Sequence, residues 1–114
     1  IFANDPPFHD IDFLKIDVEG LDAQVIRGAR KLIERRAIGI IQFEYTRAWI
    51  RSGATLLGVR EELAENGYTC ELLVGDGIYT MDFDRYREFW GPSNFLAVRD
   101  DWSEKLHVLR RGAR

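Results

Sequence analysis

The segment that most constrains the fold is IDFLKIDVEG, residues 11–20. A short apolar run delivers two carboxylates, Asp17 and Glu19, and a glycine closes it. Over residues 21–36 apolar side chains recur every three or four positions, which predicts an amphipathic helix. A strand followed by acids, a glycine and a helix is typical of open α/β sheets, where ligands bind outside the carboxyl ends of parallel strands. The segment therefore predicts both a fold and the edge of the sheet that carries a site.

A second apolar run, IGIIQFEY at residues 38–45, completes a β-α-β unit. Such units cross over right-handed and set their two strands parallel. We therefore expect Asp17 and Glu44 to lie at the same end of neighbouring strands. Gly28, inside the intervening helix, costs about 1 kcal/mol relative to alanine. We attribute this glycine to close packing of the helix on the sheet.

The rest of the chain predicts an antiparallel finish to a mixed sheet. Thr55 is a candidate helix cap, and Gly67 is placed to end that helix. The expected elements are a helix over 55–66, strands over 68–74 and 78–82 around a Gly75-Asp76-Gly77 turn, a loop or short helix over 83–90, a strand over 94–99 and a terminal helix over 102–111. The order β-α-β-α-β-β-β-α describes an open mixed α/β sheet. The basic end, Arg110, Arg111 and Arg114, is expected to be a frayed tail.

Length and composition exclude several classes of function. A chain of 114 residues makes one domain at most, and its 46% hydrophobic content is enough for a sizeable core. The net charge of -3 argues against nucleic-acid binding, and no apolar stretch is long enough to span a membrane. Cys70 is the only cysteine, and we interpret it as a small buried hydrophobe. His9 and His107 fit no metal-ligand spacing, so we expect no metal site. The single cysteine, with no visible signal peptide or membrane span, leads us to expect a cytoplasmic protein.

The candidate chemistry is a set of four carboxylates near two strand ends. Carboxylates can take a proton from a hydroxyl, hold a divalent cation or accept hydrogen bonds from a ligand. Acids at a helix start are also favoured by the helix dipole. For Asp22 we favour that structural role, and for Glu19 both interpretations stand. Asp17 and Glu44 end apolar strands, where a charge is expensive unless it is paired or used, so for them we favour function.

Residues 15–29, KIDVEGLDAQVIRGA, resemble the signature of FkbM-type S-adenosylmethionine-dependent methyltransferases. The resemblance continues in order through the later segments IGIIQFEY, NGY, GDG and SNFLAV. It implies a Rossmann-like class I methyltransferase sheet, with residues 11–17 as the fourth strand and 38–45 as the fifth. The family usually has glutamate where this chain has Asp22, so a contact that needs the longer side chain is in doubt.

The resemblance also implies a function and roles for individual residues. The function is methyl transfer from S-adenosyl-L-methionine to an oxygen, as in a hydroxyl of a small molecule or glycan. Asp17 would be the leading catalytic residue, with Glu19 or Glu44 assisting it or sharing a metal with it. Asp17 and Gly20 would contact the cofactor, Gly20 by letting the backbone approach it closely. Glu19 and Asp22 would contact the substrate.

The same resemblance implies that residues 1–114 are the C-terminal half of a methyltransferase domain, with residues 1–10 as a connector. The family's first three strands and its glycine-rich cofactor loop are not in the sequence, so we expect a fragment that is inactive alone. Residues 11–17 would then keep an unpaired apolar edge, which invites self-association. One alternative is a non-catalytic methyltransferase-like remnant that mediates protein interaction. Another is a receiver-like signalling domain, which would need a lysine at a later strand end.

Overall fold

The β-α-β unit expected at the start of the chain is present in the computed structural model, which describes residues 11–113. The strands, in chain order, are β1 (Ile11–Lys15), β2 (Ile38–Tyr45), β3 (Tyr68–Val74), β4 (Gly77–Thr80), β5 (Ser93–Arg99) and β6 (Arg110–Ala113). The helices are α1 (Asp22–Gly28), α2 (Arg30–Glu34), α3 (Trp49–Ser52), α4 (Leu56–Glu65), α5 (Phe83–Tyr86) and the 3-10 helix η1 (Asp100–Leu109).

The six strands form one open mixed sheet in the order β1-β2-β5-β3-β4-β6. β1 pairs with β2 in parallel, whereas β5 is antiparallel to both β2 and β3. β3 and β4 form the predicted hairpin, in which Val74 pairs with Gly77. The fold is therefore mixed α/β, with an open sheet that is consistent with part of a Rossmann-like methyltransferase.

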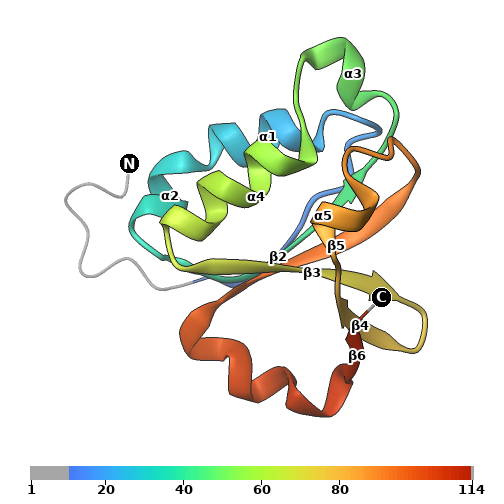
Figure 1. Cartoon of the computed structure of the whole chain (residues 1–114). Coiled ribbons are helices and arrows are strands. Elements are labelled where there is room, and N and C mark those ends of the chain that lie inside the picture. The colour runs from blue at the N-terminus through green and yellow to red at the C-terminus, as the bar shows by residue number, and fades with distance from the viewer. Residues whose placement is uncertain (1–10, 114) are drawn as a thin grey trace, which may run out of the picture.

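Two layers cover the sheet from opposite sides. Figure 1 shows α1, α2 and α4 on one side and η1 on the other. The helical side holds the larger core, in which the biggest fully buried side chains are Trp49, Tyr45, Tyr68, Phe43 and Phe95. The smaller cluster is formed by Ile40, Ile78, Leu96 and Val98, against which Trp102 and Leu106 of η1 pack. Within residues 11–113 no helix has the length and apolar character of a membrane span.

The helix expected over residues 21–36 is not continuous, and our reason for its glycine is wrong. α1 ends at Gly28 and α2 begins at Arg30. Gly28 is exposed, and a Cβ added there would meet no atom within 4 Å. No close contact explains this glycine; instead, its low helix propensity coincides with the break. α4 agrees with the sequence in detail, because the Thr55 side chain accepts a hydrogen bond from Gly58 N–H at 3.0 Å.

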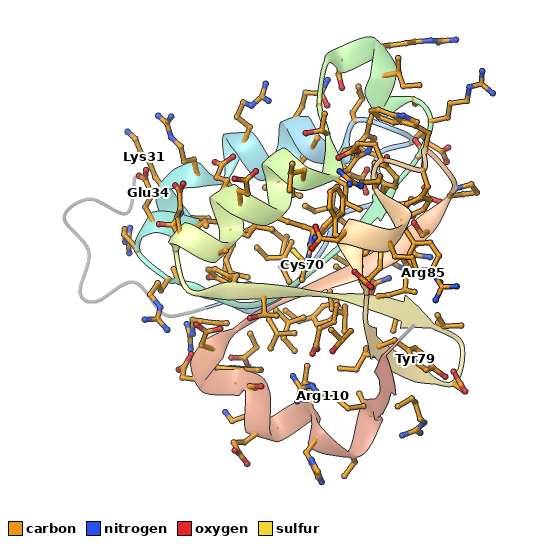
Figure 2. The ribbon with its side chains drawn as sticks, in the orientation of Figure 1. Lys31, Glu34, Cys70, Tyr79, Arg85 and Arg110 are labelled. Atoms are coloured by element: carbon orange, nitrogen blue, oxygen red, sulfur yellow. The ribbon has the colours of Figure 1, made fainter. Side chains whose placement is uncertain are left out.

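The C-terminal prediction is also wrong. Residues 102–111 do not form a terminal α-helix, because η1 is followed by β6, which pairs in parallel with β4. Arg110 is not part of a frayed tail: Nε and Nη2 donate to the carboxylate of Glu71, at 2.9 and 3.2 Å. Glu71 is only 5% exposed, and Figure 2 shows Arg110 between the sheet and η1. The expectation for Arg114 lies outside the described residues.

β1 is an edge strand, and this limits its burial. The apolar run of residues 11–17 is not buried throughout, since Phe13 is 49% exposed. The reason is that, among the described residues, β1 has a hydrogen-bonded neighbour on one side only. Self-association through this edge stays a prediction, and the expected connector at residues 1–10 lies outside the described residues.

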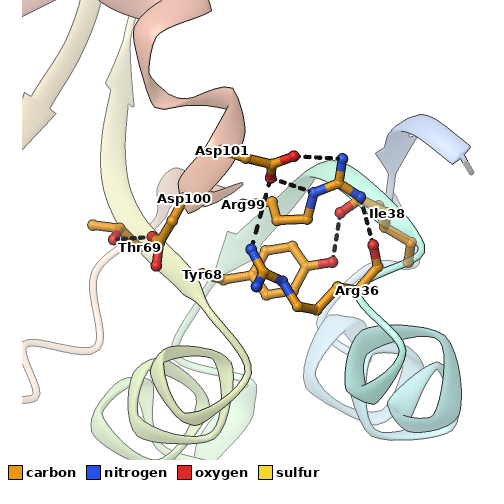
Figure 3. A network of polar contacts seen from close by, with 7 residues as sticks. All are labelled: Arg36, Ile38, Tyr68, Thr69, Arg99, Asp100 and Asp101. Atoms are coloured by element: carbon orange, nitrogen blue, oxygen red, sulfur yellow. Dashed lines mark hydrogen bonds and ion pairs between the residues drawn. The ribbon is translucent and has the colours of Figure 1, made fainter.

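A polar network fastens the layers at the amino end of β2 (Figure 3). Arg99 Nε donates to Asp101 Oδ1 at 2.6 Å, and Nη1 of the same side chain donates to the carbonyl of Arg36. Tyr68 donates from its hydroxyl to the carbonyl of Ile38. The hydrogen bond from Arg99 is the main cause that lowers the pKa of Asp101. These contacts hold η1 and the end of α2 to the sheet, at the opposite end of β2 from its acidic residue.

Candidate active site

The acidic residues predicted from the sequence lie on a tight turn after β1, the acidic turn (residues 17–22). Leu21 N–H donates to the Val18 carbonyl at 3.3 Å, and the two residues between them, Glu19 and Gly20, have φ angles of 51° and 90°. Two successive positive φ angles define a type I′ turn. A Cβ on Gly20 would also lie 2.7 Å from Ala48 Cβ. Glycine is therefore required at the second position, while Glu19 holds a conformation that few non-glycine residues adopt.

Asp22 holds this turn and the end of β2 together. Its side chain is 1% exposed, and Oδ2 accepts a hydrogen bond from Glu44 N–H at 2.8 Å. Its Oδ1 accepts from Val18 N–H at 3.3 Å. The last main-chain hydrogen bond from the β1 side is Ile16 N–H to the Gln42 carbonyl, at 2.8 Å. Beyond it, the Asp22 carboxylate takes the place of β1 beside β2, and its buried charge is satisfied by two N–H groups.

Asp22 therefore has a structural role, but not the role at the start of the helix that we favoured, because α1 has no side-chain cap hydrogen bond and Asp22 accepts from Val18 and Glu44 N–H. Both of its oxygens are engaged with the backbone, so they are already in use within the fold. The predicted substrate contact of Asp22 stays a prediction.

The other three carboxylates are placed at one end of the sheet. The last pair between β1 and β2 is Lys15 with Gln42. Asp17 and Glu44 each lie two residues beyond this pair, so they are at the same level along the two strands. Asp17 and Glu19 are exposed, and Glu44 is half-buried.

Their side-chain oxygens are available to a ligand. Within residues 11–113 none of these three side chains forms a hydrogen bond or an ion pair. Such carboxylates can accept hydrogen bonds from hydroxyl groups, and one within hydrogen-bond reach of a hydroxyl can act as a general base. In the described part of the chain no three His, Cys, Asp or Glu side chains gather as metal ligands would.

The acidic turn offers a ligand carboxylates, and not open space beside Gly20 or free N–H groups of Val18 and Leu21. The open side of Gly20 is filled by Ala48, not by empty space. The N–H groups of Val18 and Leu21 are both used inside the turn. The free groups at the turn are therefore carboxylates, which suit hydroxyls. We expect the described residues to form only part of a cofactor site, and the cofactor contacts of Asp17 and Gly20 stay predictions.

A second carboxylate arrangement was not predicted from the sequence. It lies in the segment that starts at the last residue of α5, the aromatic segment (residues 86–90). Glu88 Oε1 accepts hydrogen bonds from Leu56 N–H and from the Tyr45 hydroxyl, both at 2.9 Å, and Oε2 accepts from Leu57 N–H at 2.8 Å. The two N–H groups begin α4, where no partner exists inside the helix. A carboxylate is also favoured at this end of the helix by the dipole.

Tyr45 links the aromatic segment to the core. It is fully buried, and its hydroxyl accepts a hydrogen bond from Trp90 N–H at 3.1 Å while donating to Glu88. Burial raises the pKa of Tyr45 above its usual value, so the hydroxyl stays a donor. Arg87 and Trp90 have φ angles of 57° and 54°, each a strain of about 1–3 kcal/mol. The bonds of Glu88 and Tyr45 hold this strained backbone in place.

Comparison with known proteins gives one match. The family model described as Methyltransferase FkbM domain matches residues 2–70, which is more than half of the chain. No curated protein and no solved structure matches the chain. The matched region includes β1, the acidic turn, β2 and α4, so it contains all of the residues predicted for the site. The chain belongs to the FkbM methyltransferase domain family, whose members are S-adenosylmethionine-dependent methyltransferases.

Proposed function

We propose that this chain supplies the acceptor side of an S-adenosylmethionine-dependent O-methyltransferase that acts on a hydroxyl of a small molecule or glycan. The observation that carries the proposal is the division of labour among the carboxylates. Asp22 is buried and fully engaged with the backbone. Asp17 and Glu44 stand at the same end of two parallel strands with unengaged oxygens. At this end of the sheet Asp22 therefore stabilises the backbone, and Asp17 and Glu44 are left to bind a ligand.

These carboxylates suit the acceptor half of the reaction. S-adenosylmethionine, when bound, supplies an electrophilic methyl group. Asp17 would accept a hydrogen bond from the acceptor hydroxyl and take its proton, which leaves the oxygen a better nucleophile. Glu44 or Glu19 would orient the acceptor by a further hydrogen bond. Alignment of the two reactants is expected to carry most of the rate enhancement.

The test uses a full-length homologue that has a known hydroxyl acceptor. Replacing Asp17→Asn or Glu44→Gln keeps the size of the side chain and removes the charge. We expect each variant to lower the methyl-transfer rate by about 100-fold or more, measured with radiolabelled cofactor. Asp12→Asn, an exposed position on β1, is the matched control and should keep the rate. If both site variants transfer methyl groups normally, the catalytic assignment is wrong and an interaction module is the better account.

A second measurement addresses the 114-residue chain by itself. Its sequence has no Gly-x-Gly-x-x-Gly pattern after a strand, and Gly20 is closed by Ala48. We therefore expect titration calorimetry to detect no binding of S-adenosylmethionine at micromolar concentration. Micromolar affinity would contradict our description of the cofactor site as incomplete.

A further inference from the structure

A cavity of about 320 Å³ lies on the helical side of the sheet beneath the aromatic segment. It is lined by Leu72, Met81, Tyr86, Phe89 and Ser93. Figure 1 shows α5, which leads into the aromatic segment, on the same side of the sheet as α1, α2 and α4. The volume is in the range of small-molecule sites, which are mostly apolar and have a few placed polar groups. Here the only hydroxyl that does not belong to an aromatic ring is that of Ser93.

The walls of this cavity are held in a conformation that core packing alone would not select. Tyr86 is 43% exposed and Phe89 is 37% exposed, so both rings remain partly in water. The backbone at Arg87 combines φ 57° with ψ -156°, a region that is almost restricted to glycine. Glu88 holds this conformation from the start of α4. A strained segment that keeps two rings partly exposed around a cavity points to a ligand, because strained backbone conformations cluster at ligand-binding and active sites.

The lining also indicates which ligand fits. The rings of Tyr86 and Phe89 can stack on an aromatic group, and the Met81 sulfur makes favourable contacts with ring edges. The Ser93 hydroxyl donates to the Gly91 carbonyl at 3.2 Å, which leaves its lone pairs free to accept. We propose that this cavity is a binding site for a small aromatic molecule that carries one hydrogen-bond donor, such as a phenol or an indole. The site does not depend on methyl transfer, and it is distinct from the acidic turn.

The chain contains its own reporter for this site. Met81 is the only methionine, so the 114-residue chain labelled with 13C at the methionine methyl gives one signal from the cavity wall. Three probes distinguish the chemistry: phenol, anisole, which lacks the donor, and methyl glucoside, which lacks the ring. We expect phenol to shift the Met81 signal saturably and anisole to bind about three- to tenfold more weakly. Methyl glucoside should leave the signal unchanged.

Variants test the individual contacts on a chain whose amide spectrum is that of the folded protein. Phe89→Ala should weaken phenol binding about fivefold or more, and Ser93→Ala should remove the difference between phenol and anisole. Phe13→Ala, an exposed aromatic residue on β1, is the matched control and should change neither. If Phe89→Ala does not fold, Tyr86→Ala takes its place. The proposal is overturned if phenol gives no saturable shift, if methyl glucoside binds as well as phenol, or if the wall variants bind phenol like the parent chain.

Discussion

The acidic turn and the aromatic segment are two strained stretches of backbone, each held by a carboxylate that accepts hydrogen bonds from N–H groups. In the acidic turn, Asp22 binds Val18 four residues away, and it is itself buried. In the aromatic segment, Glu88 reaches Leu56 and Leu57, which are 32 and 31 residues away. The first arrangement presents free carboxylates and the second presents aromatic rings around a cavity. The same kind of contact therefore supports two chemically different surfaces, one held by a local bond and a bond to Glu44, 22 residues away, and the other only by bonds to more distant residues.

The largest expected effect is at Asp22. Asp22→Ala removes a buried carboxylate and leaves the partly buried N–H groups of Glu44 and Val18 without their acceptor. We expect the free energy of unfolding to fall by about 3 kcal/mol, measured by urea denaturation. Asp12→Ala, an exposed acid on β1, should change it by less than about 0.5 kcal/mol. Equal effects of the two substitutions would show that Asp22 does not hold the edge.

The glycine of the acidic turn gives the next effect. Gly20→Ala places a side chain at φ 90° and within 2.7 Å of Ala48 Cβ, so we expect a loss of about 2 kcal/mol. Gly28→Ala is the matched control because its Cβ would meet nothing within 4 Å in a helix. That variant should raise the stability by about 0.5–1 kcal/mol. Thermal unfolding that shifts the same way for both variants would refute this account of the two glycines.

The corresponding substitution in the aromatic segment should have a smaller effect than Asp22→Ala. Glu88→Ala removes the acceptor of Leu56 and Leu57 N–H, but the hydrogen bond to Leu57 is exposed, so that N–H can turn to water. We expect a loss of about 1–2 kcal/mol in urea denaturation. Glu61→Ala, an exposed acid of α4, should be nearly neutral. A loss at Glu88 greater than that at Asp22 would reverse the comparison.

Cys70 reports on which of the two regions has opened. It belongs to β3 and lies on the side of the strand that faces α4 (Figure 2), and burial raises the pKa of its thiol to about 12. A thiol with this pKa holds little reactive thiolate at pH 8, so it reacts with a disulfide reagent mainly when α4 moves away. We expect Glu88→Ala to speed the labelling of Cys70 about tenfold or less. Asp22→Ala should speed it less for each kcal/mol of stability that the variant loses. The opposite order would show that Glu88 does not fix the start of α4.

The parts of the fold that the sequence predicted depend on neighbours in the chain. Thr55 caps α4 through a residue three positions on, and the hairpin turn at Gly75 joins adjacent strands. The common end of Asp17 and Glu44 followed from the β-α-β rule, which needs only one unit. Short-range patterns were sufficient for these features.

The parts that were missed depend on distant partners. Arg110 joins β6 to the sheet through Glu71, 39 residues earlier, and nothing within the basic end indicates that acid. Glu88 is one of many acids in the sequence until α4 and Tyr45 are placed beside it. Likewise, Asp22 accepts its shorter hydrogen bond from Glu44 N–H, 22 residues later, and nothing around Asp22 in the sequence indicates that partner. A pattern read along the chain carries no signal for such contacts.

In this account, buried Asp22 stabilises the backbone at the ends of β1 and β2, while Asp17 and Glu44 act on the acceptor hydroxyl. The most direct test compares Asp17→Asn with Asp22→Asn in a full-length homologue that has a known hydroxyl acceptor, measuring the methyl-transfer rate and the free energy of unfolding of each variant. We predict that Asp17→Asn lowers the rate by about 100-fold or more with unfolding changed by less than about 0.5 kcal/mol. Asp22→Asn should lower the stability by about 1–2 kcal/mol, because an amide offers only one acceptor oxygen. An active Asp17→Asn variant, or a stability loss at Asp17 that equals the one at Asp22, would contradict the account.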